Sequence, residues 1–450
     1  MILDTTERAI KLSLRQGSIE AEAFASDNTI LTVRIASGKV VEAKKVRESG
    51  LGIRSAIGKK VGFYSCNELS EEAAKRSVDI TRAKPTNPKF NGFTHPKKSK
   101  KVRWLHDPKL ENLDDGAAVE LAEDMLQSVL DFDMRPLEAS GALNLIVERC
   151  AISNTNGVQT LDKSTKIFGH LTVEAKQGES SEGQGWNGST TLAGFDPGLV
   201  GGRAAELAFE SLGASAAEPG TYDVIFEPTA AADIFHNVLR YALNGRDVYD
   251  RFSYFSGKLG ESVSAEAFNV YDWGNMPGGL FSKTVDDEGY PTQKTSLIEK
   301  GALSNFIYDR YYGGIAKKRT TGNGLRLGDF GRSHMLEPTP YTTNLVIGPG
   351  KLNNDELMED MGEGLLISRL WYTYPITPQI GNFSTTSRCG FFVSKGEIKG
   401  PVNQIRIHEN LPKLLKQLDG IGNNQEQIVP WGASTSVCTP SVRFRDVHIK

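Results

Sequence analysis

The most informative part of this chain is residues 222–245, which read YDVIFEPTAAADIFHNVLRYALNG. An apolar strand pattern leads into Pro228, which suits the first turn of a helix, and Asn244-Gly245 is typical of a helix end. At about 100° per residue the apolar side chains share one stripe, formed by Ala231, Ile234, Phe235, Val238, Leu239 and Ala242. The pattern predicts a strand followed by a helix with one buried face.

Two polar residues of the same helix lie away from that stripe. His236 falls well outside it, and Asn237 falls on its other flank. Taken alone, these residues favour a polar helix face that is exposed or contacts a partner. A helix that carries a functional site is the alternative, and the pattern leaves both open.

The chain that follows this helix predicts a strand-rich domain. Short strand patterns alternate with glycine turns, and one helix is expected near residues 355–361. The 46 glycines of the sequence favour turns and hairpins over a helical bundle. We therefore expect residues 219–450 to form a large, mainly antiparallel C-terminal domain.

The residues before the helix predict two smaller units. Residues 1–84 form the first α+β unit, with helices at its two ends and strands between them. Residues 85–108 hold four prolines and the basic run Pro96-Lys-Lys-Ser-Lys-Lys101, which we interpret as a solvated linker rather than a nucleic-acid contact. Residues 109–218 form the central α+β unit, in which the polar, glycine-rich residues 176–190 predict a mobile hairpin tip or loop. The predicted fold class is α+β throughout.

Composition narrows the functional classes. The formal net charge is −3, so no overall basic field would attract nucleic acid. No apolar run is long enough for a membrane span or a signal peptide, which predicts a cytoplasmic protein without membrane contact. The cysteines form no CxxC pair and predict neither a zinc ribbon nor a disulfide scaffold; they are Cys66, Cys150, Cys389 and Cys438.

Three further patterns could carry chemistry. Asp286-Asp287-Glu288 could be an acid/base or metal site, although carboxylates beside a Gly-Tyr-Pro turn are more often solvated. Thr321-Gly322-Asn323 lacks the spacing of a phosphate loop and better fits a glycine turn that lines a groove. Trp371–Pro375 could form a peptide-binding wall or pack in the core. Ser384 and Ser387 have no histidine nearby in sequence, so a serine hydrolase is not indicated.

Ordered sequence blocks resemble those of the TldD/PmbA family along roughly residues 7–447. Each block alone is weak, but their order is specific. They are GLGIR at 50–54, VGF at 61–63, FSGKLGE at 255–261, VDDEGYPT at 285–292, LIEKGAL at 297–303, RTTGNGLR at 319–326, and TNL at 343–345 with GPG at 348–350.

The resemblance also identifies a degenerate metal site. TldD-type chains of the family carry HExxxH on the helix that here reads His236-Asn-Val-Leu-Arg-Tyr241. Two ligands five residues apart need a wider turn or a π-bulge to converge. Asn237 cannot accept a proton as a carboxylate does, and Tyr241 is a poor zinc ligand. The family's third ligand is a cysteine in a GxCG context, where this chain has Gly420-Ile-Gly-Asn423, and Cys438 further on is expected to be structural.

The resemblance therefore implies a PmbA-type (TldE) subunit with no catalytic and no metal-binding residues of its own. The implied partner is a TldD-type subunit that holds the zinc, although a homodimer is also possible. Together they would process unfolded or small peptides in the cytoplasm. The candidate peptide-groove residues are Asp286, Asp287, Glu288, Thr321, Gly322 and Asn323.

Two other interpretations remain. The chain could be an independent metal-dependent peptidase that uses His236 with Asp286, Asp287 or Glu288. It could also be a peptide-binding scaffold without catalysis.

Overall fold

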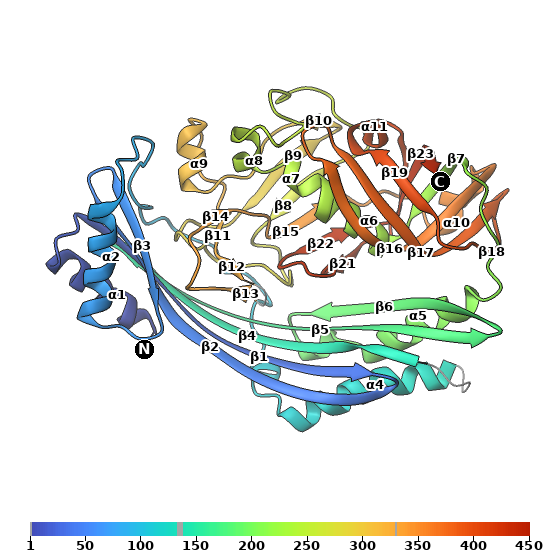
Figure 1. Cartoon of the computed structure of the whole chain (residues 1–450), viewed down its shortest axis with the longest axis horizontal. Helices are drawn as coiled ribbons and strands as arrows, with labels where there is room; N and C mark the ends of the chain where they lie inside the picture. The colour runs from blue at the N-terminus through green and yellow to red at the C-terminus, as the bar shows by residue number, and fades with distance from the viewer. Residues whose placement is uncertain (1, 133–137, 329–330) are drawn as a thin grey trace.

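A long curved sheet forms one layer of the molecule, as the computed structural model in Figure 1 shows. The structure describes residues 2–132, 138–328 and 331–450. The sheet is antiparallel, in the order β3-β2-β1-β4-β5-β6. Its strands are β1 (Glu20–Ala36), β2 (Lys39–Ile57), β3 (Lys60–Cys66), β4 (Glu138–Asn154), β5 (Gln159–Gln177) and β6 (Glu179–Ser189).

This sheet joins the first two units that we expected to be separate. β1 pairs with β4 from Glu22 opposite Asn154 to Ile35 opposite Gly141. The segment between the units is also less solvated than expected, because Phe93 and Thr94 are buried. Residues 85–108 therefore run along the body of the protein.

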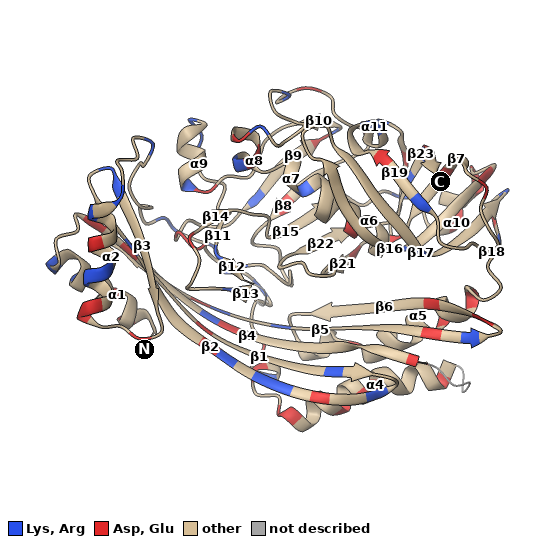
Figure 2. Cartoon of the chain, in the orientation of Figure 1, with Lys and Arg blue, Asp and Glu red and all other residues tan. Residues whose placement is uncertain are grey.

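Helices cover one face of the sheet. α1 (Ile2–Arg15) and α2 (Glu71–Ala83) lie over one end, and α4 (Asp115–Phe132) and α5 (Pro197–Glu210) lie over the other, as Figure 1 shows. The short α3 (Pro108–Glu111) precedes α4, and η1 (Leu192–Gly194) precedes α5. β2 carries charged residues of both signs, which Figure 2 colours blue and red along the strand.

The hairpin tip or loop predicted at residues 176–190 is much shorter than expected: β5 and β6 meet in a hairpin at Gln177 and Glu179, and most of the segment is strand β6. The glycines of β6 explain why this strand resembles a loop in sequence. A Cβ at Gly183 or Gly185 would overlap the backbone of α5, at Ala204 and Val200 respectively. The strand therefore uses glycine so that the helix can pack directly on its backbone, a close approach that looks like turn composition in the sequence alone.

Residues 219–450 form the rest of the molecule, called the body below, and contain a closed barrel. Its sheet runs in the order β16-β7-β23-β19-β17-β18, and β16 also pairs with β17, so five strands form a ring. β20 adds to β23. The strands are β7 (Gly220–Phe226), β16 (Glu363–Thr377), β17 (Asn382–Ser394), β18 (Glu397–Pro401), β19 (Arg406–Asn410), β20 (Leu418–Ile421) and β23 (Val442–Ile449).

A second sheet lies beside the barrel, in the order β10-β9-β8-β15-β22-β21. Its strands are β8 (Val270–Trp273), β9 (Lys294–Glu299), β10 (Ala302–Leu303), β15 (Asn344–Ile347), β21 (Glu426–Ile428) and β22 (Ser436–Thr439). Two short ribbons pair β11 (Gly324–Leu325) with β14 (Thr339–Pro340) and β12 (Leu327–Gly328) with β13 (Gly331–Arg332). The remaining helices are α8 (Gly245–Tyr249), α9 (Arg310–Ile315), α10 (Asn354–Glu359) and α11 (Leu411–Lys416).

The helix predicted after residue 226 lies in the core of this body. It consists of α6 (Pro228–Ile234), a π-helical turn η2 (Phe235–Leu239) and α7 (Arg240–Ala242). All six residues of the predicted stripe are buried, in one cluster with side chains of the barrel and of the second sheet. The expected fold class is confirmed, with strand-rich and mainly antiparallel sheets; β16 with β7 and β15 with β22 are parallel pairs.

Across the parts of the chain that the structure describes, none of the helices has the length and apolar character needed to cross a membrane.

Candidate functional site

The candidate helix has the wide turn that two ligands five residues apart would require. The backbone N–H of Arg240 donates to the carbonyl oxygen of Phe235, a bond across five residues. A π-turn leaves other carbonyl groups without their usual partners, and side chains serve them here. Tyr254 Oη donates to the Val238 oxygen at 3.3 Å, and Arg240 Nε donates to the His236 oxygen at 3.2 Å.

His236 is buried rather than exposed, which corrects the expectation of a surface-facing residue. Burial lowers the pKa of His236 well below its usual range, and the nearby Arg240 acts in the same direction. The imidazole is therefore neutral near pH 7. The Arg240 guanidinium lies between the rings of Tyr241 and Tyr341, at 4.3 and 4.2 Å from their centroids.

The two residues that replace the family's glutamate and second histidine have other contacts. Asn237 Nδ2 donates to the backbone oxygen of Asp233 at 3.0 Å, one turn earlier. Tyr241 is 40% exposed and faces Arg240. An amide cannot act as a general base, and a tyrosine hydroxyl is not among the usual ligands of zinc.

This donor set does not fit a zinc ion. One neutral imidazole, an amide and a phenol fall short of the His, Cys, Asp and Glu ligands that zinc uses in proteins. Within residues 2–132, 138–328 and 331–450 no three His, Cys, Asp or Glu side chains converge as a metal site. Cys438 lies within β22, where burial raises the pKa of its thiol to about 12, so it is not a thiolate ligand.

The acidic triplet of the sequence is buried, not solvated. Asp286 and Asp287 are fully buried and Glu288 is 3% exposed. Asp287 Oδ1 accepts from Arg332 Nε at 2.6 Å, and Glu288 Oε1 accepts from Arg54 Nη2 at 3.2 Å. Burial, reinforced by Glu288, raises the pKa of Asp286 well above its usual range.

The triplet also bonds to the other block that we had assigned to a peptide groove. Gly324 N donates to Asp286 Oδ2 at 3.1 Å, and Arg326 N donates to Asp287 Oδ2 at 2.6 Å. The structure thus brings the residue 286–288 and 319–326 blocks together, as a folded unit rather than an open surface.

Thr321 and Asn323 have internal partners as well. Asn323 Nδ2 donates to Asp272 Oδ2 at 2.6 Å, and Thr321 Oγ1 donates to Asn323 Oδ1 at 2.7 Å. Gly322 has a φ of +79°, and a Cβ there would contact the Pro291 oxygen. These contacts give the residues a structural role, and a peptide-groove role has no support from their burial.

One pairing was invisible in the sequence. Ser384 Oγ lies 3.0 Å from His408 Nε2, on neighbouring strands β17 and β19. Arg406 Nε also donates to Ser384 Oγ at 3.3 Å, and Ser384 is buried. Burial, and then the positive charges of Arg406 and Lys450, lower the pKa of His408. A Ser-His-Asp triad would instead place a carboxylate beside the histidine.

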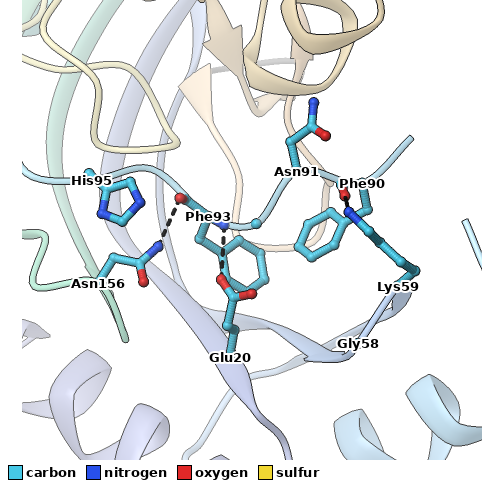
Figure 3. A pocket seen from close by; sticks show the side chains of 9 residues that line it. Glu20, Gly58, Lys59, Phe90, Asn91, Phe93, His95 and Asn156 are labelled. Atoms are coloured by element: carbon cyan, nitrogen blue, oxygen red, sulfur yellow. Dashed lines mark hydrogen bonds between the residues drawn. The ribbon is translucent and has the colours of Figure 1, made fainter. Parts of the chain in front are cut away.

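An open cavity of about 460 Å³ lies elsewhere, where the residue 85–108 segment crosses the end of the curved sheet (Figure 3). Phe93 N donates to Glu20 Oε2 at 3.3 Å, and Asn156 Nδ2 donates to the Phe93 oxygen at 2.9 Å. His95 and Lys59 complete a polar wall. None of the lining residues comes from the candidate helix.

The chain matches two family models of known proteins. Residues 219–450 match the family described as PmbA/TldA metallopeptidase C-terminal domain, and residues 21–83 match PmbA/TldA metallopeptidase domain 1. The first match alone covers more than half of the chain. The chain belongs to the PmbA/TldD metallopeptidase family. The resemblance that the sequence blocks indicated is confirmed.

Members of the PmbA/TldD family match this chain along most of its length. An uncharacterized protein of Methanocaldococcus jannaschii is 25% identical and aligns over 98% of both chains. A metalloprotease TldD homolog of Haemophilus influenzae is 23% identical over 84% of this chain and 80% of its own. The crystal structure of TldE from Thermococcus kodakarensis has a TM-score of 0.89 over 99% of both chains at 21% identity, which shows a shared fold.

Proposed function

We propose that this chain is the non-catalytic, PmbA-type (TldE) subunit of a cytoplasmic metallopeptidase, in which a TldD-type partner holds the zinc. One observation carries the proposal. The candidate helix has the π-turn needed to bring residues 236 and 241 together, yet presents only His236 as a ligand. A helix with that shape and without a general base at Asn237 fits a subunit whose chemistry is supplied by its partner.

The role proposed for this chain is to form part of the chamber that receives unfolded or small peptides. The partner would polarise the scissile carbonyl and activate water at its metal. On this side, the helix would present Tyr241, which is 40% exposed and packs against the Arg240 guanidinium, while His236 itself is buried.

An independent metal-dependent peptidase is the less favoured alternative. It would need His236 to converge with Asp286, Asp287 or Glu288. The hydrogen bonds of those carboxylates run instead to Arg54, Arg332 and backbone N–H groups.

Co-expression with an HExxxH-bearing relative from the same cell tests the proposal. We expect the two chains to co-purify, the complex to contain zinc, and peptide cleavage to require both chains. The matched control is His236→Gln in this chain, which should leave the zinc content of the complex unchanged. Stoichiometric zinc and peptide cleavage in the purified chain alone would refute the proposal, and failure to co-purify would favour the scaffold.

A further inference from the structure

Two arginines on the β16–β17 hairpin have few bonding partners for their position. Arg369 Nη1 lies 3.5 Å from Thr172 Oγ1 and 4.0 Å from Glu182 Oε2. Arg388 Nη1 lies 3.5 Å from the same Glu182 oxygen. A guanidinium has five N–H donors, and good bonds to carboxylates measure about 2.7–2.9 Å. Among the described residues, both side chains thus have only contacts at or beyond the hydrogen-bond limit.

Other buried arginines of this chain show what full pairing looks like. Arg326 donates to Glu22 at 2.8 Å and to the Leu336 oxygen at 2.6 Å. Arg443 donates to Asp419 at 2.9 Å and to the Leu357 oxygen at 2.6 Å. Arg369 and Arg388 differ from these, and their side chains remain 14% and 24% exposed. Their free N–H edges are available to an anion.

An aromatic wall holds the two guanidinium groups. Arg388 lies 3.9 Å and Arg369 lies 5.2 Å from the centroid of the Trp371 ring. The Trp371 ring stacks in turn on Tyr372, at 5.4 Å between centroids. Tyr372 is 66% exposed, so this wall continues to the surface.

The backbone is distorted at the same place. The β16–β17 register shifts on both sides of Arg369 and again between Trp371 and Tyr374. Tyr372 has a φ of +52°, which is uncommon for a bulky residue and costs free energy. Bulges of this kind redirect side chains, and they are common beside functional sites.

The charges around this cluster leave it positive. Glu182 on β6 is the one carboxylate in bonding range of the two arginines among the residues described. His170 on β5 is neutral at pH 7, because burial and then Arg369 lower its pKa to about 4. Burial raises the pKa of the Asp233 carboxyl on α6 to about 7, although the positive charge of Arg369 opposes the shift.

We propose that Arg369 and Arg388, backed by Trp371, bind the C-terminal carboxylate of a peptide beside the candidate helix. The inference rests on the proposed function only in taking a peptide as the ligand. Guanidinium N–H groups bind a carboxylate in two parallel bonds, and the Trp371 and Tyr372 rings supply an apolar surface for the adjoining side chain. Asp233 connects this cluster to the helix, since it lies one turn before Asn237.

Binding of short peptides to the purified chain tests this proposal without the partner. The probes are an acetylated alanine tetrapeptide with a free C-terminus, its C-terminal amide, and an amidated version with one glutamate, each titrated by calorimetry. We expect the free acid to bind at least about tenfold more tightly than either amide, as the loss of a charge-assisted pair implies. Arg369→Gln and Arg388→Gln should each reduce this ratio to near one.

The matched control is Lys399→Gln, which removes an exposed positive charge from β18 of the same barrel. It should leave the ratio between acid and amide unchanged. Equal binding of acid and amide, no binding of either, or an unchanged ratio in both arginine variants would overturn the proposal. Tight binding of the glutamate-containing amide would assign the cluster to acidic side chains instead. Because the partner is absent, these results are independent of whether the complex forms.

Discussion

At the scale of single residues, buried ion pairs connect the curved sheet with the body. Arg326 and Glu22 are both fully buried and lie 2.8 Å apart. Arg54 adds a second cation 2.7 Å from the same carboxylate. Removing Arg326 takes one of two cations from the buried Glu22 carboxylate, which leaves its charge only partly compensated in a fully buried site.

Arg326→Gln should therefore reduce the free energy of unfolding by about 3–5 kcal/mol, measured by urea denaturation. The control is Arg76→Gln, whose side chain is 62% exposed and lies 3.5 Å from Glu72 on the surface of α2. Its loss should change stability by less than about 0.5 kcal/mol. A similar small effect for both variants would show that the buried pair contributes little.

Asp233 should make stability depend on pH. Its folded pKa of about 7 lies above the usual value near 3.9, so the folded protein keeps a proton that the unfolded chain releases. The stability contributed by this group is thus present below about pH 4 and is lost as pH rises towards 7. The thermal midpoint of Asp233→Asn should fall less than that of the wild type between about pH 4 and 7. The control is Asp79→Asn, which alters a surface ion pair with Arg82 and should keep the pH dependence of the wild type.

At this scale, the sequence predicts features that depend on residues close together in the chain and misses those that depend on distant partners. The buried stripe of the helix was predicted because it depends on residues three and four apart. The burial of Asp287 and Glu288 was missed because their partners are distant in the chain; Arg54 lies 234 residues before Glu288.

At the scale of elements, close contact between α5 and β6 determines how the helix lies on the sheet. The contact depends on glycine at residues 183 and 185, where strand and helix backbones approach each other. From its sequence, most of β6 was interpreted as a hairpin tip or loop. Turns and tight helix–strand packing select the same residue, and composition alone does not separate them.

Gly185→Ala should destabilise the protein by about 1–3 kcal/mol or more, because its Cβ would overlap the Val200 carbonyl group. The control is Gly202→Ala on α5, the helix that packs on β6, since a Cβ at residue 202 meets no atom within 4 Å. That substitution should stabilise the helix by about 0.5–1 kcal/mol. Thermal midpoints of the two variants should therefore move in opposite directions, and a shift in the same direction would contradict this account of the interface.

At the scale of the whole molecule, the sheet and the body share a buried charge network. Glu148 on β4 accepts from Lys166 Nζ at 2.7 Å and from Arg332 N at 2.9 Å. Burial opposes ionisation of Glu148, yet Lys166 and Lys283 outweigh it and hold its pKa at about 2. Residues of the second expected unit and of the body therefore contribute to one network, which local sequence patterns did not reveal.

We expect the sheet and the body to unfold together because separating them would leave these charges unpaired. Scanning calorimetry at pH 7 should show one transition for the whole chain. Hydrogen exchange should give β4 and β23 similar opening free energies under the same conditions. Two resolved transitions, one of them for the curved sheet, would contradict this expectation.

The ring of barrel strands has a consequence for how the protein is made. β23 pairs with β7, which precedes it by roughly 200 residues. At the ribosome's speed of about 5–20 residues per second, β7 waits ten seconds or more for its neighbour. During that interval the candidate helix and its apolar stripe lack much of their cover. The nascent body should therefore depend on chaperones during synthesis, and ribosome pauses between β7 and β23 should lower its yield.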